Sequence, residues 1–92
     1  MSANSGVNAD NGIRLYPNPV GEGNTIFLDF WGFEESEFSI QVSDLGGKIL
    51  QVDSFKYTNS NSVYTLHIAS KGVFNVTISK GDYTQVKRVV VQ

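Results

Sequence analysis

Side chains able to carry out acid–base or nucleophilic chemistry are few in this sequence. His67 is the only histidine among the 92 residues, and cysteine is absent. A Cys–His pair or a thiolate metal site is therefore impossible, and His67 falls on the polar face of a strand pattern, where an imidazole is normally hydrated. Glu34, Glu35 and Glu37 are close in sequence, but a glycosidase needs two carboxylates that face each other across a cleft. The sequence therefore predicts a protein that is not an enzyme, with no catalytic residues, no cofactor and no metal site.

Aromatic side chains offer a second kind of chemistry, the stacking of a ring on the face of a sugar. Phe27 and Trp31 have the spacing that places them on one face of a strand. Phe33 and Tyr57 are candidates to extend this face, and Tyr83 begins the last hairpin. Such a face predicts, as an alternative function, a carbohydrate-binding or adhesion module of a secreted enzyme. A small sandwich also needs aromatic residues in its core, which is the interpretation that we favour. The exposure of Trp31 separates the two: a solvent-facing indole beside Phe27 favours glycan binding.

Strand-forming patterns fill most of the chain, because apolar and polar side chains alternate repeatedly. Glycine-rich and polar turns separate the alternating segments, and helical periodicity is absent. Two prolines interrupt the first segment and confine it to the edge of a sheet. These patterns, about seven short strands, predict an all-β sandwich, because two sheets laid face to face bury one side of every strand. The expected strands are 13–20, 25–31, 37–43, 49–55, 63–69, 72–78 and 83–91.

The last expected strand, 83–91, has an irregular apolar pattern. Tyr83, Val86, Val89 and Val91 do not share one face of a regular strand. We therefore expect a β-bulge between Val86 and Val89, since an extra residue would restore the alternation.

Length and composition fit one small domain. The net charge of −2 argues against general binding of nucleic acid or anionic membranes. No apolar run reaches the length of a transmembrane segment. Residues 1–12 are small and polar and are expected to be a flexible linker or an artificial chain end, whereas residues 13–92 form the domain.

Four segments, in this order and at these separations, resemble a known family. They are Leu15-Tyr16-Pro17-Asn18-Pro19, then Val42-Ser43-Asp44-Leu45-Gly46-Gly47-Lys48, then Leu66 with Gly72-Val73-Phe74-Asn75-Val76, and finally Lys87-Arg88-Val89-Val90-Val91. Together they resemble the C-terminal sorting domain, type A, of proteins exported by the type IX secretion system of Bacteroidetes. The resemblance covers residues 13–92.

The resemblance implies a seven-stranded, immunoglobulin-like sandwich at the end of a larger secreted parent protein. The implied partners are the outer-membrane type IX translocon, its signal peptidase or sortase, and the N-terminal parent. Export through the periplasm to the medium or the cell surface would follow, with cleavage or surface attachment of the parent. Residues expected to serve the motifs structurally are Tyr16, Pro17, Asn18, Pro19, Asp44, Gly47, Lys48, Gly72 and Phe74.

The terminal segment Lys87-Arg88-Val89-Val90-Val91 is the part that we expect the translocon to recognise. An apolar terminal strand with two cationic side chains and a free C-terminal carboxylate suits recognition by strand addition or by capture of the chain terminus. Lys87 and Arg88 are equally well explained as edge charges that deter aggregation. The stiff Tyr16–Pro19 segment adjoins the expected linker, where cleavage would separate the parent from the signal. Asp44 is expected to accept backbone N–H groups in its turn.

Overall fold

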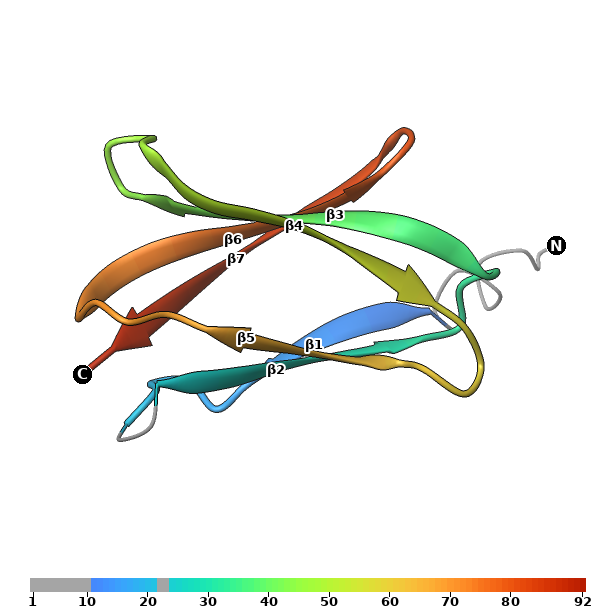
Figure 1. The fold of residues 1–92 in the computed structure, drawn as a ribbon, viewed down its shortest axis with the longest axis horizontal. Coiled ribbons are helices and arrows are strands. Elements are labelled where there is room, and N and C mark those ends of the chain that lie inside the picture. The colour runs from blue at the N-terminus through green and yellow to red at the C-terminus, as the bar shows by residue number, and fades with distance from the viewer. Residues whose placement is uncertain (1–10, 22–23) are drawn as a thin grey trace, which may run out of the picture.

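The computed structural model describes residues 11–21 and 24–92, and these contain two antiparallel sheets and no helix (Figure 1). Strands β1 to β7 span Gly12–Tyr16, Thr25–Trp31, Ser36–Asp44, Ile49–Tyr57, Val63–His67, Gly72–Lys80 and Tyr83–Val91. The predicted all-β sandwich is confirmed, while its immunoglobulin-like character stays a prediction. The expected linker lies largely outside the described residues, and β1 begins at Gly12.

The smaller sheet has the strand order β1-β2-β5, and the larger sheet has the order β4-β3-β6-β7. Figure 1 shows them as two layers that face each other. The first proline-containing segment does form an edge strand, because β1 pairs only with β2. At the other end of the chain, β7 is the edge strand of the larger sheet.

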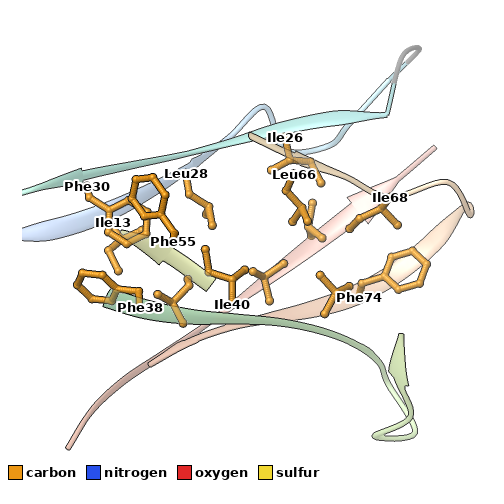
Figure 2. Packing of buried hydrophobic residues seen from close by; sticks show 14 of the residues in the cluster. Ile13, Ile26, Leu28, Phe30, Phe38, Ile40, Phe55, Leu66, Ile68 and Phe74 are labelled. Carbon is orange, nitrogen blue, oxygen red and sulfur yellow. The ribbon is translucent and has the colours of Figure 1, made fainter. Parts of the chain in front are cut away.

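The core fills the space between the two layers (Figure 2). Alternation places Ile26, Leu28 and Phe30 of β2 inward, as predicted, and all three are buried. The ring of Phe30 lies 4.9 Å, between centroids, from that of Phe38 and also 4.9 Å from that of Phe55. Burial of these large apolar side chains is the main stabilising contribution to a sandwich of this size.

Three of the aromatic residues considered for the sugar-stacking alternative pack at the core instead. Phe33 packs against Tyr83 with 5.3 Å between ring centroids and against Tyr57 with 6.1 Å. Phe33 also contacts Phe38, so the group belongs to one end of the core rather than to the face of Phe27 and Trp31. The core role that we favoured for aromatic residues is therefore confirmed for these three. Phe33 follows the turn at Gly32, which has a φ of +81°, and its ring packs back onto the core.

The expected β-bulge in the last strand is absent. Strands β6 and β7 pair without a register shift from Gly72↔Val91 to Lys80↔Tyr83. The prediction assumed that Val86 points inward, but its side chain is 57% exposed on the outer face. The inner face of β7 instead carries Gln85 and Lys87 before it reaches the apolar end of the strand. A bulge occurs between Val42 and Ser43, where β3 pairs with β4.

The turn between β3 and β4 has the predicted chemistry. The backbone N–H of Lys48 donates to Asp44 Oδ1 at 2.9 Å, which confirms Asp44 as the cap. Gly47 has a φ of +92°, a conformation that side chains disfavour. The turn therefore explains this motif locally, without a binding partner.

Candidate functional site

Residues 18–20, which we call the edge cap, lie along the open side of β7. An edge strand normally leaves main-chain donors and acceptors unpaired. Here the Asn18 side chain pairs with them: Nδ2 donates to the Arg88 carbonyl at 3.0 Å, and the Val90 N–H donates to Oδ1 at 3.1 Å. One amide side chain thus replaces one peptide unit of a neighbouring strand.

Val20 continues the edge cap with its main chain. The Val20 N–H donates to the Val90 carbonyl at 2.7 Å, and the Gln92 N–H donates to the Val20 carbonyl at 2.9 Å. The Val20 side chain is buried in the core. Chain that leaves the smaller sheet at the end of β1 therefore joins the larger sheet and occupies the C-terminal half of the β7 edge.

The N-terminal half of the same edge is open. Main-chain groups of alternate residues in an antiparallel strand point to the same side. Because the Arg88 carbonyl and the Val90 N–H point to the open side, and the β6–β7 register is unbroken, the main-chain groups of Thr84 and Val86 point there too. Within the described part of the chain, those groups have no hydrogen-bond partner. The open part of the β7 edge therefore ends at Arg88, whose carbonyl is hydrogen-bonded to the Asn18 side chain.

The five residues expected to contact the translocon do not form one surface. Val89 is completely buried and Val91 is 2% exposed, and both belong to the core. Arg88 and Val90 point outward and are exposed, while Lys87 is half-buried on the inner face. Direct contact of a partner with Val89 or Val91 would require β7 to leave the sandwich. The accessible groups of this segment are those of Lys87, Arg88 and Val90.

A hollow of about 370 Å³ lies between β1 and β7. Three cationic residues, Arg14, Lys87 and Arg88, line it. In the described ranges no carboxylate oxygen lies within 4.0 Å of their nitrogens. The other lining residues are Ile13, Leu15, Asn18 and Trp31. The sequence does not predict this site, because its residues come from the two ends of the chain and no local pattern links them.

The outer face of the smaller sheet carries the aromatic pair proposed for glycan stacking. Phe27 is half-buried, with its ring centroid 5.5 Å from that of Tyr16. The Trp31 indole is 42% exposed, which is the condition that favours glycan binding over a core role. Asp29 lies between these residues on the strand. The rings on this face, of which only that of Trp31 is exposed, are therefore interrupted by a polar residue and do not form a continuous platform.

The opposite open side of the sandwich is closed by polar contacts between β4 and β5. The Tyr64 hydroxyl donates to Asp53 Oδ2 at 2.6 Å, and Gln51 Nε2 donates to the His67 carbonyl at 2.9 Å. The first bond, together with the Ser54 N–H, holds the pKa of Asp53 below its usual value. Burial, and then the bond to Asp53, raises the pKa of Tyr64. These contacts have a structural explanation.

The groups considered for catalysis are spread over the surface. The His67 side chain is exposed on β5, and the side chains of Glu34, Glu35 and Glu37 are exposed around the start of β3. Among the residues described, no cluster of three or more His, Asp or Glu side chains could hold a metal ion. No helix in this part of the chain is long and apolar enough to cross a membrane.

Comparison with known protein families gives one match. The model of the family described as the secretion system C-terminal sorting domain matches residues 14–92. This span includes the last three residues of β1, the edge cap and the whole of β7. No curated protein matches the chain. Because the match covers all seven strands at least in part, the chain belongs to the C-terminal sorting domain family of the type IX secretion system.

Proposed function

We propose that this domain is a non-catalytic signal that directs a larger parent protein, joined to its N-terminal side, across the outer membrane through the type IX translocon. The observation that carries the proposal is the family match over residues 14–92. Passage through the periplasm, followed by release or surface attachment of the parent, completes the proposed route. A signal of this kind needs neither a cofactor nor a metal ion, only a surface that the secretion machinery binds.

The surface proposed for this recognition is β7 with its outward-facing groups. Arg88 and Val90 are accessible on the folded domain, and Lys87 is partly accessible at the hollow. Val89 and Val91 support recognition indirectly, because their burial holds the strand in place. Recognition of the folded domain therefore depends on charge and on main-chain edge groups more than on the valine side chains.

The proposed cleavage point lies on the N-terminal side of β1, not within the Tyr16–Pro19 segment. Asn18 is hydrogen-bonded to Arg88 and Val90, so cutting beside it would break the contacts that cover the β7 edge. Residues 1–11 are small and polar in sequence, which suits a protease that needs an extended substrate.

A reporter fusion tests the sorting function. A fluorescent protein with an N-terminal signal peptide is placed ahead of residues 1–92 in a host that has a type IX system. The control carries the same signal peptide and reporter without this domain. The proposal predicts that the fusion reaches the medium or the cell surface while the control stays in the periplasm. Retention of both proteins in the periplasm would contradict it.

Glycan binding is the second candidate, and the exposed indole of Trp31 is the observation that favours it. Its test is a pull-down of the domain on insoluble polysaccharides, with Trp31→Ala as the variant and His67→Ala as a matched control on the same sheet face. Binding that is lost only in Trp31→Ala would support this function. If the unmodified domain, Trp31→Ala and His67→Ala bind the polysaccharide equally, or if none of the three binds, glycan binding through Trp31 is rejected.

A further inference from the structure

We propose that the open half of the β7 edge, from Thr84 to Arg88, is a strand-addition site for an extended peptide with an acidic side chain. Its carboxylate would bind among Arg14, Lys87 and Arg88. The inference rests on the proposed function and deepens it, because it names the chemistry of the segment that the secretion machinery presents to the domain.

The main chain provides the first part of the argument. Thr84 and Val86 direct their N–H and carbonyl groups to the open side of β7, and no described residue pairs with them. An added strand gains a hydrogen bond at each such group, and its side chains then alternate between the two faces of the sheet. Asn18 occupies the edge at Arg88 and Val90, so it limits the open stretch to about five residues.

A buried acceptor lies beside this stretch. Gln85 Oε1 is buried and has no hydrogen-bond partner among residues 11–21 and 24–92. An unpaired buried polar atom costs free energy, and a ligand that donates to it recovers part of that cost. Gln85 shares the inner face of β7 with Lys87, so inward-pointing side chains of an added strand would approach both residues. A donor beside Gln85 and an acid beside Lys87 are the groups that this face lacks.

Charge defines which peptide fits. The chain is acidic overall, yet three of its seven Lys and Arg residues line the hollow between β1 and β7. Neighbouring like charges repel, and a carboxylate placed among them relieves that repulsion. The two strand edges and the apolar side chains of Ile13, Leu15 and Trp31 also line this space. An extended, partly apolar peptide with an acidic side chain can contact the cationic residues, the strand edges and the apolar side chains together. A free inorganic anion can contact only the cationic residues.

Trp31 reports directly on this site, because it is the only tryptophan in the chain and it lines the hollow. The probe is a capped peptide, Val-Thr-Glu-Val-Thr, titrated into the domain while the tryptophan emission is recorded. The matched peptide carries Gln in place of Glu, and inorganic phosphate serves as a third probe. We expect a saturable change with the Glu peptide and binding about tenfold weaker with the Gln peptide.

Two variants complete the test. Lys87→Gln should weaken binding of the Glu peptide about tenfold, while Lys56→Gln, at an exposed position on the opposite edge strand, should leave it unchanged. Melting curves establish that both variants are folded. Equal binding of the two peptides, an equal effect of phosphate, or the absence of any saturable change would overturn the inference. If the reporter is exported but the domain does not bind the peptide, the inference is wrong and the proposed function stands. If the domain binds the peptide but the reporter is not exported, the proposed function is wrong.

Discussion

The side chain of Asn18 pairs with the main chain of Val90 as a neighbouring strand would, although the two residues are 72 positions apart. The same amide group makes a second hydrogen bond, in which its Nδ2 donates to the Arg88 carbonyl at 3.0 Å. The segment at the start of the domain thus holds the strand at its end. The Asn18 side chain therefore both covers the open edge of β7 and holds the end of this strand in place.

Loss of the Asn18 side chain should loosen the end of β7. Asn18→Ala removes two hydrogen bonds, so the free energy of unfolding should fall by about 2 kcal/mol. Urea denaturation measures this change, and hydrogen exchange at the Val90 amide should become faster. Asn59→Ala, in the exposed loop between β4 and β5, is the matched control. Equal unfolding midpoints for the two variants would show that the edge cap contributes little.

Valines of the last strand should differ sharply in their contribution to stability. Val89 is completely buried, so Val89→Ala should cost about 2 kcal/mol, whereas Val86→Ala, at a position 57% exposed, should change stability by less than about 0.5 kcal/mol. Thermal and urea denaturation measure both. Similar losses of unfolding free energy in the two variants would contradict the placement of Val89 on the inner face of β7 and of Val86 on its outer face. Truncation from Lys87 onward removes core side chains, so point variants are needed to separate recognition from folding.

The bond between Tyr64 and Asp53 predicts a pH dependence at both extremes. The pKa of Asp53 is lowered in the folded state, so its stabilising contribution is present above about pH 4 and is lost as pH falls through the lowered pKa. The pKa of Tyr64 is raised, so its contribution is present below about pH 10 and is lost as pH rises further. Tyr64→Phe should flatten both limbs of a plot of unfolding free energy against pH.

Urea midpoints measured at about pH 3, pH 7 and pH 10.5 test this dependence. Tyr16→Phe is the matched control, since Tyr16 makes ring contacts but its hydroxyl has no described partner. If Tyr64→Phe and the control lose stability in parallel in acid, the bond to Asp53 does not set the acid limb.

The close approach of Trp31 to Gly12 gives a prediction that fluorescence can check. A Cβ atom on Gly12 would lie 2.5 Å from Trp31 Cζ2, so Gly12→Ala must displace the indole. We expect a shift of the tryptophan emission and a loss of about 1 kcal/mol in stability. Gly21→Ala, where a Cβ would meet nothing within 4 Å, should show neither effect. An unchanged emission in Gly12→Ala would mean that the indole does not rest on this glycine.

Strand positions were largely predictable, because period-2 alternation follows directly from burial of one face. The limits 25–31 and 83–91 match β2 and β7 in full. The strand β4 begins at Ile49 as expected but continues past 55 to Tyr57, because Phe55 and Tyr57 both place their rings in the core. The bulge expected in β7 is wrong, because hydrophobicity alone assigns Val86 to the core, whereas the sheet leaves it exposed and turns Lys87 inward.

The candidate site was less predictable, since it joins residues from the two ends of the chain. The motif containing Asn18 and the cations Lys87 and Arg88 were identifiable separately, but their contact was not. Arg14 carries no local signal, because an arginine on an edge strand is ordinary in a soluble protein. Only the three-dimensional arrangement shows that Arg14, Asn18 and Lys87 line one hollow.

Dependence of export on the type IX translocon can be measured by comparing two hosts. The reporter fused ahead of this domain is expressed in a host with the intact system and in the same host without its outer-membrane translocon, and the fraction of reporter outside the periplasm is measured. We expect surface or medium localisation in the first host and periplasmic retention of folded reporter in the second. Equal fractions in the two hosts would contradict it.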